Sequence, residues 1–330
     1  DYMGNPGSYG STTDGSQVTY DKTPPQLTNV NAASNNADIA WAKVGDSIII
    51  SFTSNEEILT PTVSILNQTS IVSNPQGNNY KAIYVPNDSD IEGEANFEIQ
   101  FSDLAGNEGT PITASTNNTK VIFDKTPPAD FTVGLLTPTG GNQVDGMWNL
   151  TNTGMDIIIP VANDTTLKNG TVQLYGKVES NSFEVLGSIS TVLSNEINAN
   201  KIISVSGTLI EGLTGFSEGQ RIYVKAVMSD RPGNITEGSQ SIIEILIDET
   251  PASITPISIL SSNNNTALAK VGDTVSVSFT TSENLIDTAA TISGQNAMIT
   301  SLGGNQFVAV YVMDENCLLY TSPSPRDQCL

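Results

Sequence analysis

The sequence predicts an all-β protein built from tandem antiparallel β-sandwiches. Three observations support this prediction: short alternating apolar runs, Gly, Pro, Asn, Ser and Thr between those runs, and internal repeats of roughly 100 residues. No segment keeps the 3.6-residue apolar period of an amphipathic helix. Several short strands in each unit of this size are typical of two antiparallel sheets packed face to face.

Two recurring motifs divide the chain into repeats. Asp-Lys-Thr-Pro-Pro occupies residues 21–25 and 124–128, and a variant, Asp-Glu-Thr-Pro, occupies residues 248–251. A second motif, Asp-x-x-Gly-Asn, precedes each of them, at residues 1–5, 103–107 and 230–234. We therefore predict the end of a preceding repeat over residues 1–20, two complete repeats over 21–123 and 124–247, and a further repeat over 248–316.

The third repeat ends abruptly at residue 317. Residues 21–89 align with residues 248–316 without a gap, and 23 of these 69 pairs are identical, whereas none of the next 14 pairs is. Residues 317–327 resemble the translation of a transposase-based sequencing adapter. We interpret residues 317–330 as an artefact of assembling short reads, so Cys317 and Cys329 are expected to be foreign rather than a disulfide or a thiol pair. The third repeat would then lack its last two strands.

Period-two alternation predicts the main strands, because successive side chains of a strand point to opposite faces. The early strand of the first repeat carries Ile48, Ile50 and Phe52, matched in the third repeat by Val275, Val277 and Phe279. A later strand carries Ala95, Phe97, Ile99 and Phe101, and its counterpart in the second repeat carries Ile222, Val224, Ala226 and Met228. In the truncated third repeat we expect residues 275–279 and 307–312 to be exposed apolar edge strands.

The motifs taken together resemble the bacterial immunoglobulin-like repeats of large surface adhesins and secreted modular proteins. The resemblance covers residues 1–316 and is carried by Ala42-Lys43-Val44-Gly45-Asp46, by the loop Asp103-Leu104-Ala105-Gly106-Asn107 and by the Asp-Lys-Thr-Pro-Pro segments. The second repeat departs from it, since it lacks the Lys-Val-Gly-Asp string and its loop is Asp230-Arg231-Pro232-Gly233-Asn234. The resemblance implies tandem immunoglobulin-like sandwiches on the bacterial cell surface or in a secreted protein.

Composition narrows the possible partners. The chain has 13 Lys and Arg against 35 Asp and Glu, a net charge of -22 and no histidine. This charge repels phosphate backbones and anionic lipids, so we expect no nucleic-acid partner, and no apolar run approaches the roughly 20 residues needed to cross a bilayer. Zinc, copper and iron lose their usual His and Cys ligands, whereas calcium prefers oxygen. The acidity is equally compatible with the solvated surface of a salt-adapted protein.

An immunoglobulin-type sandwich brings the start of its first strand, the loop after its second strand and the loop before its last strand to one end. In this chain these segments carry carboxylates and amides, which are calcium ligands. The candidate ligands are Asp21, Glu56, Asp103 and Asn107 in the first repeat, and Asp124, Asp164, Asp230 and Asn234 in the second. Related adhesin repeats bind calcium between domains. The alternative is that Asp-x-x-Gly-Asn is only a tight turn and Asp-Lys-Thr-Pro-Pro only a stiff linker.

For function, we expect a non-catalytic stalk segment of an extracellular or cell-surface protein, with neighbouring repeats as its partners. The sequence offers no His, no credible Cys nucleophile and no Gly-x-Ser-x-Gly elbow, although paired carboxylates could in principle hydrolyse glycosides. The alternative is an accessory or carbohydrate-binding module of an extracellular hydrolase, which a solvent-facing row of aromatic side chains would favour. Trp41 and Trp148 could stack on a sugar, but packing is the simpler expectation.

Overall fold

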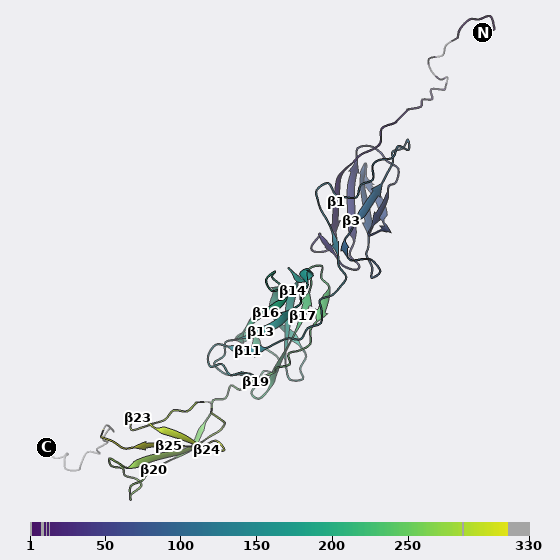
Figure 1. Cartoon of the computed structure of the whole chain (residues 1–330). Helices are drawn as coiled ribbons and strands as arrows, with labels where there is room; N and C mark the ends of the chain where they lie inside the picture. The colour runs from purple at the N-terminus through teal and green to yellow at the C-terminus, as the bar shows by residue number, and fades with distance from the viewer. Residues whose placement is uncertain (1, 8–9, 11, 13, 286, 316–330) are drawn as a thin grey trace, which may run out of the picture. The chain divides into compact units, whose positions relative to one another are not determined.

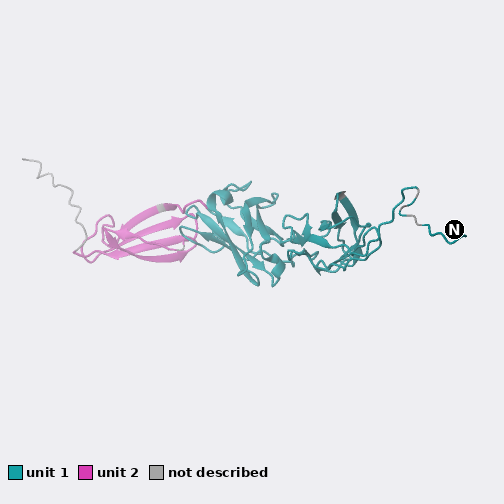
Figure 2. Ribbon diagram, turned by 90° about the horizontal axis from the view of Figure 1, so that it is seen from above, with its two compact units in different colours: residues 1–248 teal, residues 249–330 magenta. Residues whose placement is uncertain are grey.

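The computed structural model describes residues 2–7, 10, 12, 14–285 and 287–315, and it confirms the all-β prediction. The chain divides into two compact units, residues 1–248 and 249–330, coloured separately in Figure 2. The first unit contains two sandwiches with separate hydrophobic cores, and no strand lies among the described residues before Leu27. The adapter-like segment 317–330 lies outside the described residues.

The first sandwich packs three small sheets around one core (Figure 1). Their strand orders are β1-β3-β7-β6, β5-β4-β9 and β2-β10-β8. The strands are β1 (Leu27–Ser34), β2 (Trp41–Ala42), β3 (Ile48–Ser54), β4 (Thr62–Ile65), β5 (Gln68–Thr69), β6 (Ile71–Gln76), β7 (Asn79–Tyr84), β8 (Gly93–Glu94), β9 (Phe97–Gln100) and β10 (Ile122–Phe123).

The alternation in β3 and around β9 buries the residues that the sequence pattern selected. Ile48, Ile50 and Phe52 are at most 2% exposed, whereas the alternate residues Ile49, Ser51 and Thr53 are only half-buried. Phe52 stacks on Tyr80 of the paired strand β7, with ring centroids 5.5 Å apart. The predicted row from Ala95 to Phe101 is buried as well.

The second sandwich has the larger core and two sheets, ordered β11-β13-β16 and β12-β19-β17-β14-β15, with β18 paired to β17. Trp148 is fully buried and meets Phe216 edge-on, so packing explains this tryptophan. The elements are β11 (Leu136–Thr139), β12 (Met147–Trp148), β13 (Gly154–Val161), η1 (Thr165–Leu167), β14 (Thr171–Val178), β15 (Glu184–Thr191), β16 (Ala199–Ser206), α1 (Gly207–Glu211), β17 (Arg221–Ser229), β18 (Ile235–Glu237) and β19 (Ile245–Ile247).

In each sandwich one pair of named strands departs from the antiparallel arrangement. The last strand, β10 or β19, pairs in parallel with the short strand β2 or β12. Parallel neighbours need a long connection, and here nearly the whole repeat separates the two strands. The five-residue helix α1 also departs from a structure made only of strands. No helix of the described segments is long and apolar enough to cross a membrane.

The described part of the third repeat forms one four-stranded sheet, β20-β21-β25-β24, and a small hairpin, β22-β23. The expectation that residues 275–279 and 307–312 are edge strands is wrong, because β21 and β25 lie in the middle of that sheet. The exposed apolar side chains lie on the edge strand β20 instead, where Ile257 and Ile259 are more than 60% exposed. The strands are β20 (Ile254–Ser261), β21 (Thr274–Thr281), β22 (Thr291–Ile292), β23 (Gln295–Asn296), β24 (Met298–Gly303) and β25 (Gln306–Val312).

Candidate metal centres

The Asp-x-x-Gly-Asn segment of the first repeat folds into a tight turn closed by its own aspartate. The backbone N–H of Asp103 donates to the carbonyl of Asn107 at 3.1 Å, and Gly106 adopts a φ of 90° that a side chain would disfavour. The Asp103 carboxylate accepts the backbone N–H of Asn107 at 2.8 Å and its side-chain amide at 2.7 Å. The turn interpretation therefore describes the backbone correctly.

The second repeat builds the same turn from a different sequence. The N–H of Asp230 donates to the Asn234 carbonyl at 3.0 Å, and Gly233 has a φ of 94°. The Asp230 carboxylate accepts the N–H of Asn234 at 2.7 Å and its side-chain amide at 2.9 Å. Replacing Leu104-Ala105 by Arg231-Pro232 leaves the turn intact because neither residue contributes to these bonds.

In both repeats the asparagine joins this turn to the start of its own repeat. The side-chain amide of Asn107 donates to the carbonyl of Asp21 at 3.3 Å, and that of Asn234 donates to the carbonyl of Asp124 at 3.0 Å. The starts match too, since Asp21 and Asp124 each accept the N–H of the residue two positions later. The Asp-x-Thr-Pro and Asp-x-x-Gly-Asn motifs therefore form one structural site.

The first site gathers three carboxylates. One oxygen from each of Asp21, Glu56 and Asp103 lies within 4.8 Å of the others, and no ion pair among the described residues involves them. Hydrogen bonds from Asn107 lower the pKa of Asp103, so this carboxylate is charged at neutral pH. Three anionic oxygens at this spacing are suited to a hard cation such as calcium.

The second site is more deeply buried. Asp124 is 6% exposed and Asp230 is 2% exposed. Oδ2 of Asp124 is buried and accepts no hydrogen bond from the protein. Burial raises the pKa of Asp124 to about 6, with smaller contributions from a hydrogen bond from the Thr126 N–H, which lowers it, and from the charges of Asp230, Glu92 and Asp164, which raise it. A buried carboxylate oxygen without a donor is costly, and a bound cation would compensate it.

Asp164 and Glu92 complete the surroundings of this second site. Asp164 caps the short helix η1, accepting the N–H and hydroxyl of Thr166 at 2.8 and 2.7 Å. Among the described residues its carboxylate does not join a triad as compact as that of the first site. Glu92 belongs to the first repeat and accepts the Thr126 hydroxyl at 2.6 Å and the Lys125 N–H at 2.9 Å.

Sequence reasoning missed Glu92. The available signal was the acidic run Asp88, Asp90 and Glu92, which directly precedes β8 of the first repeat. Alignment with the third repeat could not reveal it, because its counterpart falls in the unrelated tail. Glu92 brings an acidic group of one repeat to the start of the next.

The two asparagines orient the aspartates around the sites. Asn107 and Asn234 were candidate ligands, and their amide nitrogens face the aspartates and the repeat starts. In this arrangement they orient carboxylates that could bind a cation, as supporting residues around metal sites do.

The second sandwich carries a row of half-buried aromatic side chains on an outer sheet face. Tyr175, Phe183 and Tyr223 lie there, interleaved with Lys177 and Lys225, whose ammonium groups are 4.6–5.8 Å from ring centroids. The Tyr223 hydroxyl donates to Glu244 at 2.8 Å. The ammonium groups lie over these rings and Lys225 also pairs with Glu237 at 2.6 Å, so the row is a mixed aromatic and charged patch rather than a bare stacking platform.

Comparisons with known proteins add little to this geometry. No family model and no curated protein matches the chain. One similar solved chain is described as "Complete structure of manganese lipoxygenase of Gaeumannomyces graminis and partial structure of zonadhesin of Komagataella pastoris". It is 12% identical, the match covers 64% of this chain and 91% of that chain, and the TM-score is 0.19. A TM-score this low supports no conclusion about fold or function.

Proposed function

We propose that this chain is a non-catalytic stalk segment of a bacterial cell-surface or secreted adhesin-like protein, and that calcium binds at the start of each complete repeat. The observation that carries the proposal is the recurrence of one arrangement in both complete repeats, built from Asp21 and the turn at Asp103 in the first and from Asp124 and the turn at Asp230 in the second. In each copy an asparagine orients a buried aspartate and holds the repeat start.

Calcium would act on the connection between the first two repeats. Glu92 of the first repeat and Asp124 of the second are close enough for the charge of Glu92 to raise the pKa of Asp124. Lys125 reinforces the same connection by donating to the carbonyls of Asp88 and Asp90 at 2.7 and 2.8 Å. A cation bound there would cancel carboxylate repulsion and limit bending between the two sandwiches.

A calcium titration followed by thermal unfolding and small-angle scattering tests this proposal. We expect calcium to raise the melting temperature and to make the first two repeats longer and stiffer, with half-saturation on the order of 0.1–1 mM. Asp124→Asn should remove most of the stabilisation of the second sandwich. Asp145→Asn, the same substitution at an exposed site, should not. Unchanged shape and melting temperature in calcium would remove the metal from the proposal.

The aromatic patch supports a second candidate, a carbohydrate-binding module of an extracellular hydrolase. Tyr175, Phe183 and Tyr223 could stack on sugar rings, while Lys177 would favour an acidic polysaccharide. Affinity electrophoresis in gels containing a neutral or a uronic-acid polysaccharide tests this candidate. Retardation that is lost in Tyr175→Ala and Tyr223→Ala would favour the module, and unretarded migration in both gels would favour the stalk.

A further inference from the structure

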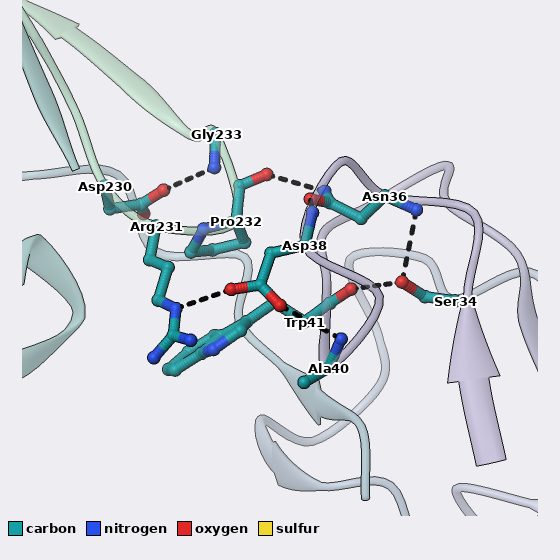
Figure 3. Close-up of polar contacts among 9 residues, drawn as sticks. All are labelled: Ser34, Asn36, Asp38, Ala40, Trp41, Asp230, Arg231, Pro232 and Gly233. Atoms are coloured by element: carbon teal, nitrogen blue, oxygen red, sulfur yellow. Dashed lines mark hydrogen bonds and ion pairs between the residues drawn. The ribbon is translucent and has the colours of Figure 1, made fainter. Parts of the chain in front are cut away.

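Besides the carboxylate site, the first two repeats are joined by a contact between one loop and one surface (Figure 3). The loop is Arg231-Pro232-Gly233 of the second repeat. The surface, which we call the platform, consists of residues 34–46 of the first repeat. Asn36 donates its side-chain amide to the Pro232 carbonyl at 2.8 Å, and Lys43 donates to the Gly233 carbonyl at 2.8 Å.

The arginine makes the side-chain part of this contact. Its Nε donates to Oδ2 of Asp38 at 2.7 Å, and its guanidinium carbon lies 5.3 Å from the centroid of the Trp41 ring. Both charged side chains are 34% exposed, so the ion pair is partly shielded from water. A planar guanidinium that pairs with a carboxylate and stacks on an indole cannot be replaced equivalently by an aliphatic side chain.

The third repeat rebuilds most of the hydrogen bonds of the platform. Asn263 donates to Asp273 at 2.8 Å as Asn36 does to Asp46, and the N–H of Lys270 donates to Asp273 at 2.8 Å as that of Lys43 does to Asp46. The turn bonds between these residues also recur, with Asn265 accepting from Ala267 as Asp38 accepts from Ala40. The two side chains that bind backbone carbonyls in the first platform are thus present in the third.

Two residue differences between the third and the first platform affect the side chains that contact the arginine. Asp38 corresponds to Asn265 and Trp41 to Leu268, so the third platform has lost the charge and the indole that hold an arginine. Leu268 is 62% exposed. The loop of the first repeat has an apolar residue that would match this apolar platform: Leu104 occupies the position of Arg231 in the second repeat, and it is 61% exposed.

We infer that the platform and the loop form a matching pair in two versions. In the first, a loop arginine binds an aspartate and a tryptophan of the platform; in the second, a loop leucine packs on an asparagine and a leucine of the platform. The platform over residues 261–273 is then a docking surface whose occupant is a sandwich with a leucine loop like residues 103–107. The carbonyl contacts provide adhesion common to both versions, and the side chains decide which repeats can be neighbours. The contact needs no metal.

A mutant cycle in the full chain tests both versions at one joint. Cys317 and Cys329 are replaced by Ser, one spin label is placed on each of the first two sandwiches away from the contact, and the inter-label distance distribution is measured in chelator. We expect Arg231→Leu alone, and Asp38→Asn with Trp41→Leu, each to broaden the distribution. The combination of all three substitutions recreates the leucine version and should narrow it again.

Arg221→Leu is the matched control, because it removes an arginine and its ion pair with Glu244 on a sheet face of the second sandwich. It should leave the distribution unchanged. If the distance distribution of the triple variant is as broad as that of the two mismatched variants, the matching rule is wrong. If neither mismatched variant broadens the distribution, the contact does not hold the two sandwiches together. Both results are independent of calcium, so they are distinguishable from a failure of the proposed metal sites.

Discussion

Asn107 and Asn234 each use one amide group to hold an aspartate carboxylate and the backbone of a repeat start. The motif spacing indicated that these residues would meet, because a sandwich brings its first strand and last loop to one end. Spacing could not show which atom of the amide faces inward. The amide nitrogen faces inward because the carboxylate and the carbonyl around it can only accept hydrogen bonds.

The supporting role of the asparagine leads to a prediction. Asn107→Ala leaves all three carboxylates of the first site in place but removes the side-chain donor to Asp103, so calcium affinity there should fall by about 10- to 100-fold. Calorimetric titration would measure the change. Asn96→Ala, at an exposed position of the same sandwich, should bind calcium like the unsubstituted protein. Equal affinity in both variants would contradict the supporting role.

The buried carboxylates of the second site predict an unusual pH dependence without metal. Because burial raises the pKa of Asp124 to about 6, the folded state binds a proton more tightly than the unfolded state, whose pKa is near 3.8. The free energy of unfolding of the second sandwich should therefore rise, by about 1–3 kcal/mol, as pH falls from 7 to 5 in chelator. Asp230 acts in the same direction, since burial raises its pKa as well.

The first sandwich should behave differently over this range. Hydrogen bonds lower the pKa of Asp103, so its contribution to stability is lost only when pH falls below about 4. Unfolding followed at several pH values distinguishes the two sandwiches. In Asp124→Asn the rise toward pH 5 should be reduced, whereas in Asp145→Asn it should persist. An unchanged rise in Asp124→Asn would assign the effect to other groups.

At the scale of elements, alternation identified the long strands because each has one buried face. The rows of β3, β9 and β17 are buried as predicted. The two-residue strands β2, β8, β10 and β12 escape such reasoning, since two residues contain no period. The parallel pairing of β2 with β10 and of β12 with β19 depends on contacts across nearly a whole repeat.

Separate cores predict separate responses to a core truncation. Ile159 of β13 is fully buried in the core of the second sandwich. Ile159→Ala should destabilise that sandwich by about 2–5 kcal/mol and leave the unfolding transition of the first nearly unchanged. Chemical unfolding followed by NMR signals from each core would measure both. If the two transitions moved together by similar amounts, the sandwiches would form one cooperative unit.

At the scale of the whole molecule, the net charge of -22 alone does not identify a metal protein. The capacity to bind a cation depends on where the acidic residues lie. Three carboxylates converge at the first site, and a buried carboxylate oxygen lacks a donor at the second. The repeat motifs indicated both places, but burial and the contribution of Glu92 depend on how one sandwich meets the next. Those features require coordinates.

The side-chain amide resonances of Asn107 and Asn234 report on the two centres separately, so their calcium titration is the most direct measurement. We predict saturable shifts of both resonances, half complete on the order of 0.1–1 mM calcium. Asp103→Asn should abolish the response at Asn107 alone, and Asp124→Asn the response at Asn234 alone. If neither resonance moves at roughly ten times the upper concentration, no calcium binds at the repeat starts, and the proposed stalk mechanism is wrong.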